Sequence, residues 1–180
     1  VIDTEAMEKV MQTGFLQDVD AIITQGVVSD EVVNLAWDLG IPVFLVDSDM
    51  PDSDRICYMG KDFREQAELL LDHIEERVDP DTELRIAIQV AESRFTIAQE
   101  QIRQIEEVFA QHPGGVEIVS VSDSKSEEAR ARKEWDAVIQ EHPDINVAIN
   151  FAAESAEFCW EAVNDSGLRD DVLIYGVDDM

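Results

Sequence analysis

Apolar residues follow two spacings along this chain, and segments of the two kinds take turns. Six short runs of apolar and β-branched residues have strand character: 19–24, 41–46, 84–90, 116–121, 145–150 and 172–177. Six other segments place apolar residues every three or four positions, as amphipathic helices do: 5–17, 30–39, 61–78, 95–111, 126–141 and 153–164. The alternation predicts an α/β fold with parallel sheets between layers of helices. The first four residues also resemble the end of a strand.

The segment from Gly40 to Asp62 contains the most informative of these runs. Residues 41–46 are apolar almost without interruption, which is typical of a parallel strand covered on both faces. The run stops at Asp47, and a second short strand is expected within 55–60. Because ligands bind beyond the carboxyl ends of the strands in open parallel sheets, Asp47 is a candidate binding residue. The alternative is a loop aspartate that caps nearby backbone groups.

Several local features predict how side chains are used. Ser29 is placed to cap the helix that follows it, and Gly40 to end that helix in a left-handed conformation. Trp37 and Trp135 lie at helical spacing and are expected to pack in the core. The two cysteines, Cys57 and Cys159, are expected to be small buried apolar residues, and their spacing implies no disulfide.

The charge of the chain limits its partners. Its 180 residues include 41 acidic and 13 basic residues, a formal net charge of −28. Such a surface disfavours broad contact with nucleic-acid phosphates or an anionic membrane. No apolar run approaches the roughly 20 residues of a membrane-spanning helix. A solvated acidic surface is the simplest interpretation, and a salt-tolerant or secreted protein is also compatible with it.

The chain lacks the residue patterns of common active sites. His73, His112 and His142 are scattered, and they form neither a metal-ligand spacing nor part of a nucleophile–base set. No glycine-rich phosphate loop is present. The acidic pairs 47/49 and 178/179 could hold a hard cation, but they lack a calcium-loop spacing. We therefore expect no enzyme, no cofactor and no bound metal.

Three stretches of the chain resemble the type I periplasmic binding proteins, which include sugar receptors of ABC transporters and ligand domains of lactose-repressor-type regulators. Gly40-Ile41-Pro42-Val43 with Asp47, Asp49, Pro51 and Ser53, followed by Tyr58-Met59-Gly60-Lys61-Asp62, matches one family pattern. The stretches 141–150 (EHPDINVAIN) and 172–180 (VLIYGVDDM) match two others. The resemblance extends over essentially the whole chain.

This resemblance implies a two-lobed type I periplasmic-binding-protein-like fold of three αβα layers. It places a partial N-terminal lobe at 1–59 and a C-terminal lobe at 60–180. The first lobe would be incomplete, with an exposed sheet edge, because the family's first strand and first helix would precede Val1. Further helices and strands would follow Met180.

The resemblance also implies a set of ligand-binding residues. Asp47 and Asp49 would contact ligand from the first lobe, and Asp178 from the second, unless Asp178 only caps a following helix. The family's ligand-binding arginine corresponds to Gln101, so Arg94 is the candidate replacement, with Arg103 as another. Ala152 stands where the family has a ligand-binding asparagine, and Asn150 would point elsewhere.

The function that follows from the resemblance is an extracytoplasmic receptor. It would bind a small polar ligand, a carbohydrate, between the lobes by hinge closure, and pass it to an ABC transporter permease or a sensor protein. The alternative is the ligand-sensing domain of a cytoplasmic transcriptional regulator. This part of the protein would contact no nucleic acid and insert into no membrane.

Overall fold

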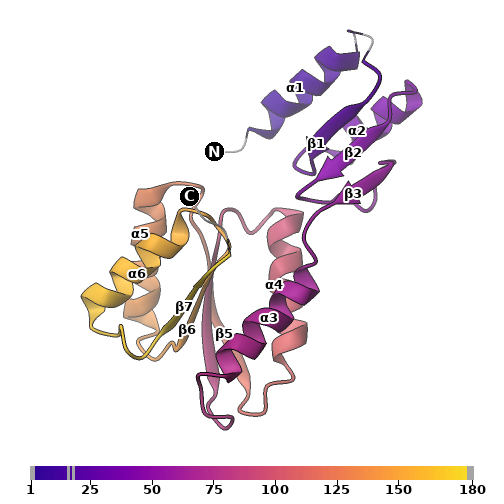
Figure 1. Cartoon of the computed structure of the whole chain (residues 1–180). Helices are drawn as coiled ribbons and strands as arrows, with labels where there is room; N and C mark the ends of the chain where they lie inside the picture. Colours follow the sequence, from indigo (N-terminus) through magenta and orange to yellow (C-terminus); the bar gives the residue numbers. More distant parts are fainter. Residues whose placement is uncertain (1–2, 16, 18, 178–180) are drawn as a thin grey trace. The chain divides into compact units, whose positions relative to one another are not determined.

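The computed structural model describes residues 3–15, 17 and 19–177, which form two compact units. The smaller unit comprises the chain up to Asp62 with residues 95–97, and the larger comprises 63–94 and the chain from Ala98. Each unit contains one parallel sheet (Figure 1). The predicted α/β fold with parallel sheets and flanking helices is confirmed.

The smaller unit has a three-stranded parallel sheet in the order β1-β2-β3. Its elements are α1 (Thr4–Phe15), β1 (Ile22–Gln25), α2 (Asp30–Asp38), β2 (Val43–Val46) and β3 (Cys57–Met59). Met11 of α1 and Val33 of α2 join Val43 and Leu45 of β2 in one buried cluster. A strand end predicted at residues 1–4 is not found, since Thr4 is helical and residues 1–2 lie outside the described part.

Among the described residues, helices cover only one face of this sheet, and the expectation that 41–46 is buried on both sides is wrong. Val43 and Leu45 are buried, whereas Phe44 and Val46 are only half-buried. On their side of the sheet, Ile23 of β1 is 70% exposed and Met59 of β3 is 57% exposed. Cys57 pairs with Phe44 in the same row and is exposed rather than buried, for the same reason.

The prediction for α2 is confirmed at its C-terminal end and wrong at its N-terminal end. Gly40 has φ +76°, the left-handed conformation predicted for the end of the helix. Ser29 makes no capping hydrogen bond with its side chain. Its backbone N–H instead donates to Glu8 Oε1 of α1 at 2.9 Å, which ties the two helices together. Trp37 is 51% exposed, so the expected packing of this side chain is wrong.

The larger unit has a four-stranded parallel sheet in the order β5-β4-β6-β7. Its strands are β4 (Leu84–Val90), β5 (Val116–Asp123), β6 (Val147–Asn150) and β7 (Leu173–Gly176). Its helices are α3 (Phe63–Glu75), α4 (Thr96–Phe109), α5 (Glu128–Glu141) and α6 (Ser155–Ser166). Figure 1 shows α3 and α4 on one face of the sheet, and α5 and α6 on the other.

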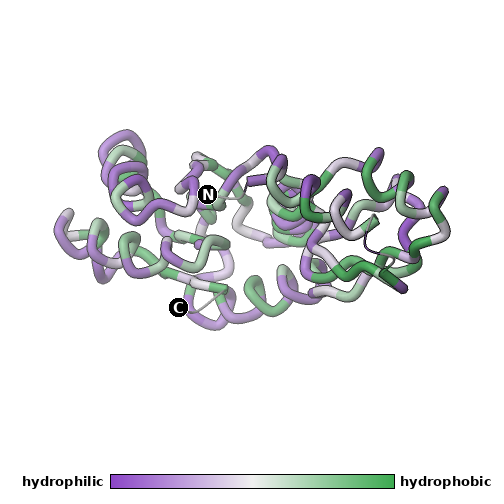
Figure 2. Tube along the Cα trace, turned by 90° about the horizontal axis from the view of Figure 1, so that it is seen from above, coloured by the Kyte–Doolittle hydropathy of each residue, from purple (hydrophilic) through white to green (hydrophobic). Residues whose placement is uncertain are grey.

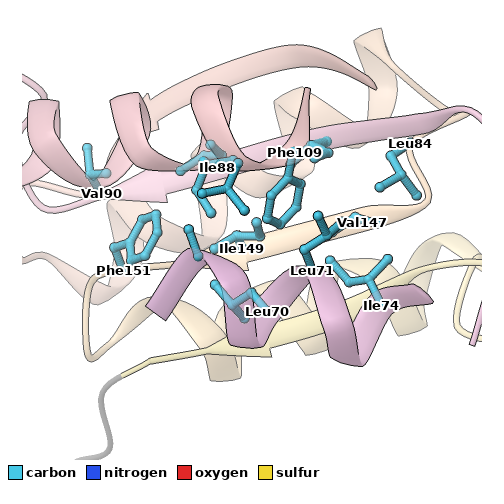
Figure 3. Packing of buried hydrophobic residues seen from close by; sticks show 14 of the residues in the cluster. Leu70, Leu71, Ile74, Leu84, Ile88, Val90, Phe109, Val147, Ile149 and Phe151 are labelled. Atoms are coloured by element: carbon cyan, nitrogen blue, oxygen red, sulfur yellow. The ribbon is translucent and has the colours of Figure 1, made fainter. Parts of the chain in front are cut away.

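Both faces of this second sheet are packed. Figure 3 shows Leu71 and Ile74 of α3 and Phe109 of α4 gathered around Val147 and Ile149 of β6. On the opposite face, α5 and α6 pack against the sheet in a second cluster that contains Trp135 and Cys159, both fully buried as predicted. In Figure 2 the helices carry both hydrophilic and hydrophobic positions, as the spacing of their apolar residues predicts. None of the described helices has the length and apolar character needed to cross a membrane.

Two further details of the larger unit concern single side chains. Leu69 of α3 is 64% exposed, whereas its neighbour Leu71 is buried in the core. The side chain of His112 is fully buried. Its two ring nitrogens lie 2.9 Å from Glu75 Oε1 and from the carbonyl oxygen of Thr82, which joins the ends of α3 and α4 to the start of β4.

Candidate functional site

The carboxyl end of β2 holds Asp47 in an unusual backbone conformation. Asp47 has φ +65°, a region that L-residues other than Asn and Asp rarely adopt. Its N–H donates to the carbonyl of Met59 at 3.0 Å, and its own carbonyl accepts from the Tyr58 hydroxyl at 2.9 Å. The main-chain N–H and carbonyl of Asp47 therefore hold the residue in place, and the carboxylate takes no part in these two bonds.

Two glycines allow the loop around Asp47 to form. A Cβ on Gly60 would lie 1.8 Å from the Tyr58 hydroxyl oxygen, so only glycine lets the tyrosine fold back toward Asp47. A Cβ on Gly26 would lie 2.5 Å from the carbonyl oxygen of Ser48, which accepts from the Gly26 N–H at 3.0 Å. Burial raises the pKa of Tyr58, and the charges of Asp47 and Asp49 raise it further.

The two aspartates of this loop differ in their partners. Asp49 faces Arg55, with 2.5 Å between Oδ1 and Nε and 2.9 Å between Oδ2 and the NH2 nitrogen. Asp49 Oδ1 also accepts the Met50 N–H at 2.8 Å. The carboxylate of the exposed Asp47 accepts one long bond of 3.3 Å from Gln25 Nε2. Asp47 thus has acceptor capacity for a ligand, whereas most of the capacity of Asp49 is already used.

In the larger unit, backbone bonds hold together the loops that follow β4 and β5. Ser124 N–H donates to the carbonyl of Val90 and Lys125 N–H to that of Ala91, both at 2.9 Å. Ser93 N–H donates in the other direction, to Asp123 Oδ1 at 2.9 Å. Lys125 and Ser126 have φ of +58° and +55°, so this corner is strained. These bonds tie the two loops together at the carboxyl edge of the sheet.

Four charged side chains form a network on that edge. Glu92, which is 7% exposed, lies 2.6 Å from Arg94 Nε and 3.5 Å from Lys125 Nζ. Lys125 Nζ also lies 2.7 Å from Asp123 Oδ2. The bond from Arg94 lowers the pKa of Glu92 despite its burial, and the bond to Asp123 raises the pKa of Lys125. Burial opposes ionisation of Asp123, but bonds from Lys125 and Ser93 outweigh it and lower its pKa.

A third loop, which follows β6, contributes one more acidic group to the edge. Glu154, at the start of α6, is 9% exposed. Its Oε1 accepts a short hydrogen bond from the hydroxyl of Ser124, which is fully buried in the loop after β5. The three loops after β4, β5 and β6 thus meet through side chains as well as backbone.

The structure places the predicted binding residues as follows. Asp47 and Asp49 lie in the loop after β2, and Arg94 lies in the loop after β4. Gln101 is 7% exposed within α4. Asp178 lies outside the described residues. None of these assignments to ligand binding is tested, and they stay predictions.

Asn150 behaves as expected for a residue that ends a strand and points elsewhere. Its Nδ2 donates to the carbonyl of Tyr175 at 3.0 Å, and its Oδ1 accepts from the Ser155 hydroxyl at 2.5 Å. Ser155 also contacts Gln89 Oε1 and Trp135 Nε1, at 2.6 and 3.0 Å. This buried polar cluster is structural.

Sequence reasoning missed Glu92, Asp123, Lys125 and Glu154. One signal was available for Asp123, since it is a charged residue at the carboxyl end of a strand. Asp47 has a similar position, directly after the last residue of β2. Glu154 gave no such signal, because its partner Ser124 lies 30 positions away in the chain. Lys125 has a near partner in Asp123, but its contact with Glu92 joins distant parts of the chain. Among the described residues, no group of three His, Cys, Asp or Glu side chains is arranged to hold a metal ion.

Two parallel α/β units with polar loops at the carboxyl ends of their strands define a class of ligand-binding domain. A family model described as a periplasmic binding protein domain matches residues 2–180, and the chain belongs to this family. The family is one of binding domains rather than enzymes. No curated protein sequence matches the chain.

Solved structures of binding proteins share the fold. A glucose-galactose binding protein from Geobacillus stearothermophilus is 24% identical with a TM-score of 0.86, over 97% of this chain and 62% of that one. An ABC transporter solute-binding protein from Burkholderia graminis, in complex with D-arabinose, is 19% identical with a TM-score of 0.86, over 99% and 63%. The fructose-binding periplasmic domain of a hybrid two-component system is 20% identical with a TM-score of 0.83, over 95% and 57%.

These identities establish similarity of fold and no more. The chain spans 57% to 63% of the length of these three proteins.

Proposed function

We propose that the protein is an extracytoplasmic receptor for a small polar ligand of the carbohydrate class. The observation that favours this most is the exposed carboxylate of Asp47, which is held by its backbone at the end of β2 and has one long hydrogen bond. Ionised carboxylates accept strong hydrogen bonds from hydroxyl groups. The relatives with the same fold are described as binding glucose and galactose, D-arabinose or fructose.

In this proposal the ligand contacts both carboxyl edges. Asp47 serves the N-terminal lobe, proposed as 1–59, and the charged network around Glu92, Arg94 and Lys125 serves the C-terminal lobe, proposed as 60–180. Asp49, Gln101 and Asp178 are further proposed contacts. Closure about the segment near Tyr58–Asp62 would exclude water and strengthen these bonds.

The receptor would deliver its ligand, or report its binding, to a membrane partner. An ABC transporter permease and a sensor protein are the two candidates, since relatives with this fold are named for an ABC transporter and for a two-component system. A regulator's sensing domain is not carried forward, because the relatives reported above are binding proteins of other systems.

A thermal-shift screen tests the ligand class. The protein is heated with D-glucose, D-galactose, D-arabinose, L-rhamnose and D-fructose, each at millimolar concentration. A ligand that binds only the folded state at 100 times its Kd stabilises it by about 2.7 kcal/mol, which raises Tm by several degrees. A selective rise with one or two sugars is expected. No rise with any sugar would contradict the carbohydrate class.

A further inference from the structure

The large negative charge of the chain is not explained by the proposed binding site. The sequence contains 41 acidic and 13 basic residues, with a formal net charge of −28. Even if every basic residue neutralised one acid, most acids would have no cationic partner. The way in which the fold uses its few cations therefore decides where the excess charge lies and what it does to stability.

Several arginines are each shared between two or three carboxylates. Three carboxylates lie within 3.2 Å of Arg132 and join α5 to α6, namely those of Asp136, Glu161 and Asp165. Two further arginines are shared in the same way: Arg85 pairs with Glu117 and Asp144, and Arg103 pairs with Glu100 and Glu107. Because each of these three groups has more acids than cations, it stays negative after its ion pairs have formed.

The exposed side of α3 shows the excess charge most clearly around Asp72. Asp72 is exposed, Glu68 and Glu76 lie four positions from it, and Glu75 lies three positions from it. Residues at these spacings are neighbours on the surface of a helix, and like charges there are destabilising. Asp72 also lies in the last turn of α3, where the negative end of the helix dipole disfavours an acid.

Ion pairs relieve this repulsion only in part. Glu68 pairs with Arg64 at 3.0 Å and Glu76 with Arg77 at 3.3 Å, all on exposed side chains. Asp72 itself takes part in no ion pair with any residue that the structure describes. Exposed ion pairs contribute little to stability. The repulsion around Asp72 is therefore relieved mainly by ions of the solvent.

We propose that ionic strength controls the stability of this protein and that its surface is adapted to a medium of high salt. Exposed like charges repel one another over the Debye length, which is about 30 Å at 0.01 M salt and about 3 Å at 1 M. At low salt the repulsion destabilises the compact state, and at high salt it is screened. The inference goes beyond the proposed function and does not depend on the ligand.

Thermal unfolding of the ligand-free protein in 0.01, 0.1 and 1 M NaCl is the first test. We expect Tm to rise by about 10 °C or more over this range, because each step shortens the Debye length. KCl should act like NaCl, since screening depends on the charge of the ion and not on its kind. A Tm that stays constant or falls, or that rises with only one of the two salts, would overturn the proposal.

Two matched variants separate charge repulsion from a general effect of salt on folding. Asp72→Asn removes a repelled charge, so in 0.01 M NaCl its Tm should exceed that of the wild type by about 2 °C. Asp136→Asn makes the same change in α5 but removes a charge that lies 2.9 Å from Arg132, so its Tm should stay at or below that of the wild type. In 1 M NaCl the gain of Asp72→Asn should disappear. A gain that persists in 1 M NaCl, or no gain over Asp136→Asn in 0.01 M, would overturn the proposal.

Discussion

The carboxyl edges of the two sheets are built in different ways. In the smaller unit, backbone shape fixes the edge: Asp47 has positive φ, and Gly26 and Gly60 permit close approaches that no other residue allows. In the larger unit, side-chain charges fix the edge, with Lys125 between Asp123 and Glu92. The difference shows that two parallel sheets can end in different kinds of edge: a loop held by its backbone with an available carboxylate in one unit, and a network of mostly paired charges in the other.

The largest effect should come from Gly26→Ala in the smaller unit. The added Cβ meets the backbone of Ser48 at 2.5 Å, so the loop must move, and we expect a loss of about 3 kcal/mol in the free energy of unfolding. Gly14→Ala is the control, since its nearest neighbour would be Val19 Cγ2 at 3.8 Å and alanine favours the helix by about 0.5–1 kcal/mol. Chemical denaturation measures both, and equal stability of the two variants would contradict the close approach.

A smaller effect, and one that depends on pH, is expected from Asp123→Asn in the larger unit. The pKa values of Asp123 and Glu92 are lowered in the folded protein, so their contribution to stability is present above the unfolded-state pKa of about 4 and is lost as pH falls below it. Wild-type stability should therefore fall between pH 5 and pH 3 on the order of 1 kcal/mol more than that of Asp123→Asn.

The exposed Asp170 provides the control for this comparison. Asp170→Asn should keep the acid sensitivity of the wild type when unfolding is followed by tryptophan fluorescence. If Asp123→Asn and Asp170→Asn respond to pH in the same way, the charged network does not stabilise the larger unit.

The smallest effect should come from Tyr58→Phe. This change removes one hydrogen bond to the carbonyl of Asp47, and the N–H of Asp47 still donates to Met59. We expect a loss of about 0.5–1 kcal/mol in the free energy of unfolding. A loss above about 2 kcal/mol would mean that the phenol supports the whole loop.

Apart from the strand end expected at residues 1–4, the sequence was sufficient for the order of helices and strands, because each element has its own apolar spacing. It also located Gly40 and the position of Asp47 after an apolar strand. Which face of a strand or helix is covered is a tertiary property, so Cys57 and Trp37 were wrongly expected to be buried. The network in the larger unit joins residues that are distant in the chain, such as Glu92 and Lys125, and no local pattern marks such pairs.

The measurement that tests the account most directly is calorimetric titration of Asp47→Asn with the sugar that gives the largest thermal shift. Asparagine tolerates the positive φ of this position, so the variant should fold with nearly unchanged Tm. The control is Asp52→Asn, an exposed aspartate of the same loop. We predict at least a tenfold loss of affinity for Asp47→Asn and none for Asp52→Asn. Equal affinities in the two variants would remove Asp47 from the site and contradict the account.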